Sequence, residues 1–317
     1  MKKILITGSS GFIGFHISKF LIKRKYIVIG IDSHNNYYSK NIKKKRLSIL
    51  KKNRNFFFNK IDINNKQKLK KVFQKFLPNA VIHLAGQPGV LYSFKNPKSY
   101  YVNNTNATKT LCKISKDFKI KKFIFGSSSS VYGDQKNFPI LENAKLNPKN
   151  VYAKTKLKSE GIVNKTFLRS RTNFIIFRFF TVFGPYGRPD MFIHKFLNHI
   201  KLNKLINIHN NGLNFRDFTF VDDVVKILEK SLKKEITNTI INLCRSKPIL
   251  TKKLIRIILK HYPAKKNLLK KTMFVKGEMY KTHGSNTKLK KIFGKIKFTD
   301  LENGLKKTIN NYIKNKI

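Results

Sequence analysis

The feature that most constrains the fold is a glycine-rich turn directly after the first apolar stretch of the chain. Residues 2–7 read KKILIT, and residues 8–14 read GSSGFIG, with glycine at the first, fourth and seventh positions. Apolar residues at helical spacing begin at Phe12. Glycines let backbone amides approach a pyrophosphate, and a helix N-terminus stabilises its negative charge. The turn therefore predicts a strand, a phosphate-binding loop and a helix that together hold a dinucleotide.

A second apolar run, residues 26–31 (YIVIGI), ends at Asp32, 18 positions after Gly14. In dinucleotide-binding folds, a carboxylate at this point accepts hydrogen bonds from the adenosine ribose. Its negative charge repels a 2′-phosphate, so Asp32 favours NAD over NADP. An aspartate in an ordinary turn is the alternative interpretation.

The first half of the chain alternates short apolar runs with segments of helical spacing. Near-continuous apolar strands separated by helices are typical of a parallel sheet whose two faces are both covered. The pattern predicts an α/β fold with a Rossmann-like, doubly wound parallel sheet. Further strands are expected at 55–59, 80–84, 122–125 and 174–180, and helices at 12–24, 66–76, 97–117 and 151–170.

The rhythm of the sequence changes after about residue 181. An irregular loop rich in glycine and proline covers 184–189, and shorter elements follow, ending in an expected helix over 300–314. We therefore expect residues 1–180 to form the NAD-binding domain and residues 181–317 to form a smaller C-terminal substrate-binding lobe. Part of the second segment is expected to return to the sheet.

A Tyr-x-x-x-Lys pattern at Tyr152 and Lys156 lies within a segment of helical spacing. Residues four apart share one face of a helix, and a neighbouring ammonium stabilises a phenolate, so Tyr152 is a candidate base. The expected fifth strand runs into four serines, 127–130. Hydroxyls at the carboxyl end of such a strand lie at the cofactor crevice. Without that context, the pattern would equally describe a solvated helix face.

The composition is strongly basic, with 68 Lys and Arg against 15 Asp and Glu and a net charge of +53. The lysines are spread from Lys2 to Lys316, which indicates compositional bias rather than a specific nucleic-acid surface. The positive field still favours an anionic substrate. No apolar run reaches the ~18–20 residues that span a bilayer. The two cysteines and eight histidines show no disulfide or metal-ligand spacing, so we expect a cytoplasmic protein without a metal site or a membrane partner.

Six segments carry a resemblance to a known family: TGSSGFIG, HLAGQPGVLYSFKNP, SSSSVYG, YAKTK, RFFTVFGPYGRPDM and NFRDFTFVDD. On these segments the chain is similar, from end to end, to extended short-chain dehydrogenases/reductases of the NAD-dependent epimerase/dehydratase family. It most closely resembles the UDP-glucuronate 4-epimerases. The resemblance implies NAD as cofactor, a UDP-sugar substrate used in polysaccharide biosynthesis, and a homodimer formed through the helices that carry Asn104 and Tyr152.

The resemblance also implies roles for individual residues. The catalytic triad would be Ser128, Tyr152 and Lys156, of which the last two also contact the cofactor. The other cofactor contacts would be Gly8, Gly11, Phe12, Ile13, Gly14, Asp32, Asp62, Ile63, Ala85, Gly86, Asn104 and Phe180. Substrate contacts would come from Ser127, Ser130, Thr181, Arg188 and Arg216. The two arginines would meet the sugar carboxylate and the diphosphate, because guanidinium groups suit both anions.

The expected reaction inverts C4 of a UDP-sugar, converting UDP-glucuronate to UDP-galacturonate through a transient 4-keto intermediate. Leu91 stands where the family usually carries an arginine, which favours a UDP-glucose 4-epimerase as the alternative. A nucleotide-sugar dehydratase is a weaker alternative. The related dehydratases carry a carboxylate in the loop before a Val-Tyr-Gly element, where this chain has Ser128, Ser129 and Ser130.

Overall fold

The computed structural model describes residues 2–236, 238–264, 268–273 and 279–315. The chain divides into two compact units. The first contains Met1–Val131, Pro148–Arg178 and Val225–Ile241, and the second contains Tyr132–Asn147, Phe179–Val224 and Asn242–Ile317. The chain therefore leaves the first unit after the serine-rich loop and returns to it twice.

The first unit is built on a 7-stranded sheet with strand order β10-β6-β5-β4-β1-β2-β3. Strand β1 pairs in parallel with both β2 and β4, so the order of the chain reverses beside it. This reversal is the point at which doubly wound sheets open a crevice for ligands. The strands are β1 (Lys3–Thr7), β2 (Ile27–Asp32), β3 (Phe56–Lys60), β4 (Ala80–His83), β5 (Lys122–Ser128), β6 (Asn173–Phe179) and β10 (Thr239–Leu243).

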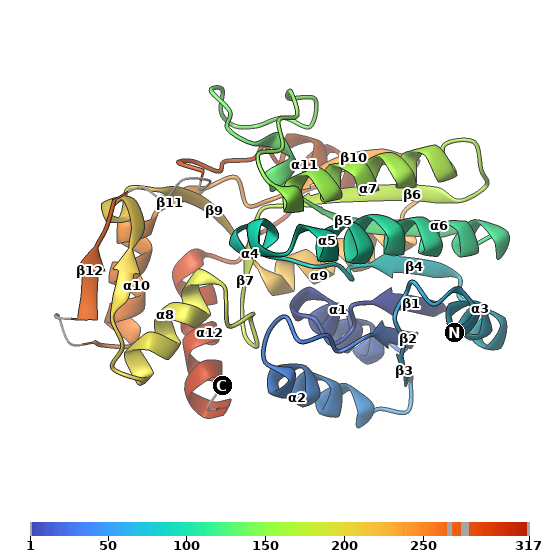
Figure 1. Ribbon diagram of the computed structural model, residues 1–317, viewed down its shortest axis with the longest axis horizontal. Coiled ribbons are helices and arrows are strands. Elements are labelled where there is room, and N and C mark those ends of the chain that lie inside the picture. Colours follow the sequence, from blue (N-terminus) through green and yellow to red (C-terminus); the bar gives the residue numbers. More distant parts are fainter. Residues whose placement is uncertain (1, 237, 265–267, 274–278, 316–317) are drawn as a thin grey trace. The chain divides into compact units, whose positions relative to one another are not determined.

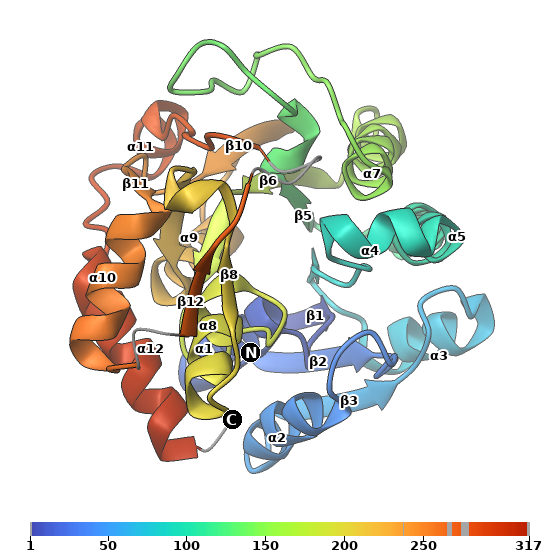
Figure 2. The same cartoon turned by 60° about the vertical axis from the view of Figure 1, so that its left-hand side comes forward.

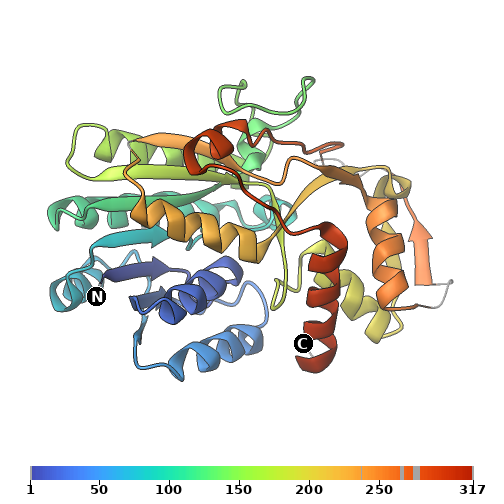
Figure 3. The same cartoon turned by 180° about the vertical axis from the view of Figure 1, so that it is seen from behind.

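Helices cover both faces of this sheet, which confirms the predicted Rossmann-like α/β fold. Figure 1 shows α3, α6 and α7 along one face, and Figure 3 shows α1, α2 and α9 along the other. Shorter helices connect β4 to α6. The helices are α1 (Phe12–Lys23), α2 (Lys40–Lys51), α3 (Lys66–Phe76), α4 (Val90–Lys95), α5 (Pro97–Tyr100), η1 (Tyr101–Asn106), α6 (Ala107–Asp117), η2 (Ser129–Tyr132), α7 (Val151–Phe167) and α9 (Val221–Lys233).

The single helix predicted over 97–117 is interrupted. Residues Tyr101–Asn106 form a π-helix, η1, between α5 and α6. Such wide turns occur mostly as short insertions and are frequent at functional sites. The π-helix directs Asn104 inward. Its side chain is buried there and forms hydrogen bonds with the backbone of Gln87. Apolar spacing alone does not reveal this, because the π turn depends on a partner distant in sequence.

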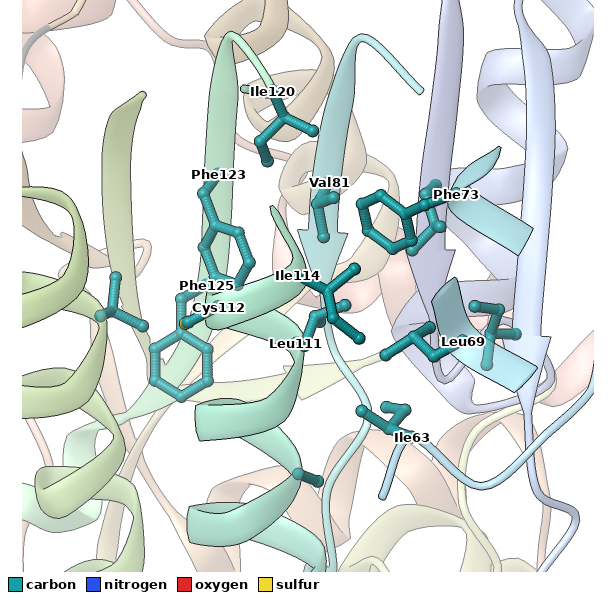
Figure 4. Close-up of a cluster of buried hydrophobic side chains, with 14 of the residues drawn as sticks. Ile63, Leu69, Phe73, Val81, Leu111, Cys112, Ile114, Ile120, Phe123 and Phe125 are labelled. Carbon is teal, nitrogen blue, oxygen red and sulfur yellow. The ribbon is translucent and has the colours of Figure 1, made fainter. Parts of the chain in front are cut away.

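The core of the first unit lies between the sheet and the helices α3, α6 and α7 (Figure 4). Val81, Phe123 and Phe125 project from β4 and β5 against Leu111 and Ile114 of α6. All of these side chains are at most 7% exposed. Strands β4 and β5 are therefore held on this face by a continuous apolar layer.

The second unit contains a 3-stranded sheet, β11-β9-β7, and a 2-stranded sheet, β12-β8 (Figure 2). Its core gathers aromatic and aliphatic side chains from α8, α10 and α12 around β9. Its elements are β7 (Thr181–Phe183), α8 (Phe192–Lys201), β8 (Ile206–Ile208), η3 (His209–Gly212), β9 (Phe215–Phe220), β11 (Pro248–Leu250), α10 (Thr251–His261), β12 (Leu269–Lys271), α11 (Thr287–Phe293) and α12 (Leu301–Asn315). Among the described residues, no helix is both long and apolar enough to cross a membrane.

Replacing a core phenylalanine tests this packing. Phe123 is fully buried, and its ring centroid lies 4.9 Å from that of Phe167. We expect Phe123→Ala to lower the free energy of unfolding in urea by about 3–5 kcal/mol, since it removes buried area and leaves a cavity. The control is Phe57→Ala on β3, where the side chain is 42% exposed and the expected loss is about 1 kcal/mol or less. Equal losses would contradict the assignment of Phe123 to the core.

Candidate active site

The glycine turn packs tightly between β1, α1 and the segment after β4. Gly8 has φ +70°, and a Cβ built on it would lie 2.9 Å from the backbone nitrogen of Ala85. The amides of Gly8 and Ser9 both donate to Ile31 O, at 2.8 and 3.2 Å. A Cβ on Gly14 would collide with Gly8 O. The absent side chains therefore bring the turn, the start of α1 and Ala85 into direct contact.

Asp32 lies at the end of β2, beside this turn. Its Oδ2 accepts from Ser10 N at 3.1 Å, and its Oδ1 accepts from His34 N at 2.9 Å. The carboxylate is thus held at the edge of the glycine turn, where the sequence predicts the adenosine ribose. Of the neighbouring predicted residues, Phe12 is buried in α1 and Ile13 is half-buried.

Two cations of α2 near Asp32 are not anticipated from the sequence. Lys43 is buried and donates to Asn35 O and Asn35 Oδ1, at 3.0 and 2.7 Å. Burial lowers the pKa of Lys43, and the Asp32 carboxylate opposes that effect. Arg46 is fully buried and donates from Nη1 to Ser10 O at 3.0 Å and to Tyr38 Oη at 2.8 Å. In a chain with lysine throughout, spacing alone gives no sign that these two point inward.

The segment after β4 is fixed by two networks. Asn104 of η1 accepts from Gln87 N at 2.6 Å and donates to Thr155 Oγ1 of α7 at 3.0 Å. A Cβ on Gly86 would lie 2.8 Å from Asn104 Oδ1, so Gly86 lets the asparagine close over the turn. His83 is fully buried between Thr7 and Thr108, and burial lowers its pKa to about 3. His83 is therefore a neutral, packed side chain.

The remaining predicted adenine neighbours follow β3. Asp62 is exposed, and its Oδ1 accepts from Asn64 N at 2.8 Å. Ile63 is 6% exposed and belongs to the core beside α3. Two buried polar atoms near the glycine turn and the β4 segment, Ser9 Oγ and Gln87 Nε2, have no hydrogen-bond partner among the described residues. A turn whose glycines leave no room for Cβ atoms, an acid at the end of β2 and these polar atoms fit a dinucleotide.

Lys156 lies one turn after Tyr152 on α7, and its ammonium is buried against the end of β5. Nζ donates to Gly126 O at 2.5 Å and lies 4.3 Å from the centroid of the Phe125 ring. Burial lowers the pKa of Lys156 to about 8, against the opposing charge of Glu160. Asn150 caps α7, accepting from Ala153 N at 2.9 Å. This cap fixes the first turn of the helix, which carries Tyr152.

The serines at the end of β5 have different surroundings. Ser128 Oγ lies 3.1 Å from Ser130 Oγ and accepts from Ser130 N at 3.2 Å. Ser127 points away from this pair and donates to the buried Glu160 at 2.5 Å. Its hydroxyl is therefore engaged with a protein carboxylate, and contact of Ser127 with a sugar stays a prediction.

The predicted residues Phe180, Thr181, Arg188 and Arg216 belong to the second unit. Phe180 is 5% exposed, and its amide donates to Leu243 O at 3.3 Å. Thr181 pairs with Phe218 of β9, so Arg216 lies two residues before its partner on the neighbouring strand. Arg188 makes a bidentate pair with Asp190, at 3.0 and 2.5 Å. Arg216 Nη1 donates to Phe215 O and Tyr280 O, at 2.8 and 3.2 Å.

Asp217, beside Arg216 on β9, is another buried group not anticipated from the sequence. Its Oδ2 accepts from Ser246 N at 3.1 Å and from Gly284 N at 3.3 Å. Its Oδ1 has no hydrogen-bond partner among the described residues. Burial raises the pKa of Asp217 to about 6, and the amides of Gly284 and Ser246 oppose the shift. In the described part of the chain, no group of three or more His, Cys, Asp or Glu could hold a metal ion.

Comparison with known proteins identifies the family. The profile of the NAD dependent epimerase/dehydratase family matches residues 4–244. The chain belongs to this family. This confirms the family that the sequence motifs indicate, together with its dependence on NAD.

Individual relatives are similar in sequence to this chain over nearly its full length. The chain is 38% identical over 318 residues to the uncharacterized protein MJ1055 of Methanocaldococcus jannaschii, covering 99% of this chain and 97% of that protein. It is also 38% identical over 308 residues to UDP-glucuronate 4-epimerase of Thermodesulfobacterium geofontis, covering 96% and 94%. The structure of UDP-glucuronic acid 4-epimerase from Bacillus cereus, in complex with UDP-glucuronic acid and NAD, matches with a TM-score of 0.92 and 32% identity, covering 99% and 100%.

The raised pKa of Asp217 predicts a pH-dependent stability. The folded protein binds this proton more tightly than the unfolded chain, so the contribution is complete below about pH 4 and is lost as the pH rises through about 6. Asp217→Asn keeps an acceptor for both amides and does not ionise. We expect the stability of the variant relative to the wild type to increase by up to about 3 kcal/mol between acidic and neutral pH. Urea unfolding at several pH values measures this, with the exposed Asp117→Asn as control, and a pH-independent difference would contradict it.

Proposed function

We propose that this chain is an NAD-dependent 4-epimerase that interconverts UDP-glucuronate and UDP-galacturonate. The observation that carries the proposal is the buried Lys156 ammonium at the end of β5, with Tyr152 one helical turn before it. This pair occurs in a chain that is 38% identical, over nearly its whole length, to a UDP-glucuronate 4-epimerase. The geometry supports proton transfer, and the relatives support the substrate.

Tyr152 acts as the base in this proposal. The Lys156 ammonium favours the phenolate, which removes the proton of the sugar 4-hydroxyl. NAD, when bound, would accept the hydride from C4 and give it back to the opposite face of the 4-keto sugar, which inverts C4 and leaves the cofactor unchanged. Tyr152 then returns the proton, so one side chain serves both directions. The Ser128–Ser130 hydroxyl pair positions the 4-oxygen and shares its proton.

The glycine turn and Asp32 hold the cofactor. Gly8, Gly11 and Gly14 allow the backbone to approach the pyrophosphate at the start of α1, with Phe12 and Ile13 beside them. Asp32 accepts from the adenosine ribose, with Asp62 and Ile63 flanking the adenine. Ala85, Gly86 and Phe180 line the nicotinamide. Asn104 acts on this region through Gln87, which it bonds at both backbone atoms.

The sugar carboxylate must be held while C4 is a ketone, because a β-keto acid loses CO₂ when its breaking bond aligns with the ketone π system. Thr181, Arg188 and the serines are proposed to hold the carboxylate away from that alignment. Arg216 is proposed to meet the diphosphate. Guanidinium groups suit both anions, since their paired donors match the oxygens.

A UDP-glucose 4-epimerase is the second candidate, and Leu91 favours it. This side chain, on α4 after the glycine-containing turn, is 57% exposed and carries no charge. The chain also matches the structure of UDP-glucose 4-epimerase from Thermotoga maritima, with a TM-score of 0.90 and 26% identity, covering 99% and 100%. The two reactions differ only in the group at C6.

A homodimer formed through the helices around Asn104 and Tyr152 is also proposed. Helix α4 and the π-helix η1 expose Leu91, Phe94 and Tyr101, which are 57%, 56% and 42% exposed. A second copy would cover these apolar side chains. We further propose a cytoplasmic location, where the buried thiols of Cys112 and Cys244 stay reduced, with no specific nucleic-acid partner.

The role of Asp32 predicts the choice of cofactor. Asp32→Asn removes the negative charge that accepts from the ribose and repels a 2′-phosphate. We expect the Kd for NAD to rise about tenfold and the preference for NAD over NADP to fall by at least as much. Isothermal titration with both cofactors measures this, and Asp117→Asn on α6 is the matched control. An unchanged preference would remove Asp32 from the ribose site.

The reaction is tested with UDP-glucuronate and UDP-glucose in separate incubations, followed by separation of the C4 epimers. We expect UDP-galacturonate from the first, and a loss of about 100-fold to 10,000-fold in kcat for Tyr152→Phe. The control is Tyr101→Phe, which removes the phenolic hydroxyl of a tyrosine that is 42% exposed and should keep full activity. Epimerisation of UDP-glucose alone would favour the second candidate. A decarboxylated or dehydrated product would rule out both epimerases.

A further inference from the structure

The first unit contains a buried ion pair that joins α7, the proposed catalytic helix, to β6. Arg178 of β6 binds Glu160 of α7 through Nη2 to Oε2 at 2.8 Å and through Nε to Oε1 at 3.1 Å. The two side chains are only 3% and 4% exposed. Ser127 Oγ donates to the same carboxylate at 2.5 Å. Three donor atoms from two strands therefore fix one helical carboxylate.

Glu160 continues the face of α7 that carries the catalytic pair. Tyr152, Lys156 and Glu160 are spaced by four residues, so they lie one above the other along the helix. Lys156 donates to Gly126 O, and the next residue, Ser127, donates to Glu160. The strand end that carries Ser128 is thus bound to α7 at two successive residues, once by a cation and once by an anion.

Few other ionisable groups face Lys156. On its own helix these are Tyr152 and Glu160, and α5 contributes Tyr100, whose ring centroid lies 6.3 Å from that of Tyr152. His83 at the end of β4 is kept neutral by burial, which lowers its pKa to about 3. On α6, burial raises the pKa of the Cys112 thiol, and on β6 the Arg178 guanidinium is bound to Glu160. Within the described part of the chain, Glu160 is therefore the carboxylate whose charge acts on Lys156.

We propose that Glu160 is a positioning residue whose carboxylate, fixed by Arg178 and Ser127, keeps the Lys156 ammonium charged and the β5 end aligned with α7. The inference rests on the proposed function, in which Tyr152 and Lys156 work as a pair. Burial lowers the pKa of Lys156 to about 8, and Glu160 opposes this. Arg178 in turn pairs with the buried carboxylate, so that the negative charge of Glu160 has a partner in the protein interior.

The first measurement is the pH dependence of kcat in the NAD-bound enzyme. Tyr152 and Lys156 titrate as a coupled pair beside the Glu160 carboxylate. Removing that negative charge makes the proton of the phenol and the proton of the ammonium easier to lose, so both limbs of the pH profile should move to lower pH. We expect a shift of about one pH unit in Glu160→Gln, larger on the alkaline limb, which reports Lys156. A purely structural ion pair would instead lower kcat by the same factor at every pH, which would overturn the proposal.

Two further variants guard against misfolding. Glu160→Gln leaves a buried guanidinium unpaired, whereas the double variant Glu160→Gln with Arg178→Met removes both charges at similar volume. The double variant should fold and move both limbs in the same direction as Glu160→Gln, but by less, because it also removes the Arg178 cation. Glu160→Asp retains the charge, so its limbs should stay near the wild-type positions even where kcat falls. Wild-type limbs in the double variant would contradict the proposal.

A second readout does not depend on turnover. Ionisation of Tyr152 is followed by the ultraviolet absorbance of its phenolate, as the difference between each enzyme and the same enzyme carrying Tyr152→Phe. The phenolate should form at lower pH in Glu160→Gln and in the double variant. If the wild type does not epimerise a UDP-sugar, the proposed function fails while this titration still decides the role of Glu160. If the wild type and the Glu160 variants are active and their Tyr152 titrations are identical, the role proposed for Glu160 is wrong while the proposed function stands.

Discussion

A buried ammonium at the end of a parallel strand is the constraint on which the site depends. Taking the Lys156 charge out of water is costly, and the structure compensates with the carbonyl of Gly126, the face of the Phe125 ring and the carboxylate of Glu160. These three partners come from β5 and α7. The helix and the strand end are therefore joined by the ammonium proposed to activate Tyr152, so the geometry of the proposed site and local stability depend on one set of contacts.

The cofactor side obeys a steric constraint rather than an electrostatic one. Gly8, Gly14 and Gly86 each lack a Cβ where it would meet backbone or the Asn104 side chain. These contacts bring the starts of three loops together where the order of the sheet reverses at β1. The π-helix completes the arrangement, since it lets Asn104 bond the β4 segment and Thr155 of α7 at once. The β4 segment, η1 and α7, which carry proposed cofactor and catalytic residues, are thereby joined within one unit.

Local patterns in the sequence predict the parallel sheet, the glycine turn, Asp32 and the Tyr152–Lys156 helix, because strand runs and i,i+4 spacing are written in neighbouring residues. What they miss depends on distant partners. Glu160 meets Arg178 and Ser127, Arg46 meets Ser10, and Asp217 meets Gly284. In a chain with 68 Lys and Arg, no spacing distinguishes an inward cation from a solvated one. Only the packing of α2 and β6 reveals Lys43, Arg46 and Arg178.

The scarcity of acids makes the few buried ones informative. The chain has 15 Asp and Glu, and among the described residues Glu160, Asp217, Asp223 and Glu229 are at most 5% exposed. Asp223 accepts from Thr299 at both N and Oγ1, and Glu229 pairs with Lys233. An exposed carboxylate on such a basic surface is attracted to many lysines, but solvent and salt screen each of these ion pairs, so each contributes little to stability. A buried carboxylate binds specific amides or a guanidinium in a medium of low dielectric constant. Replacing the acid leaves those groups unpaired where water cannot reach them. Of these four buried acids, Glu160 is the one that lies one helical turn after Lys156, the lysine proposed to take part in catalysis.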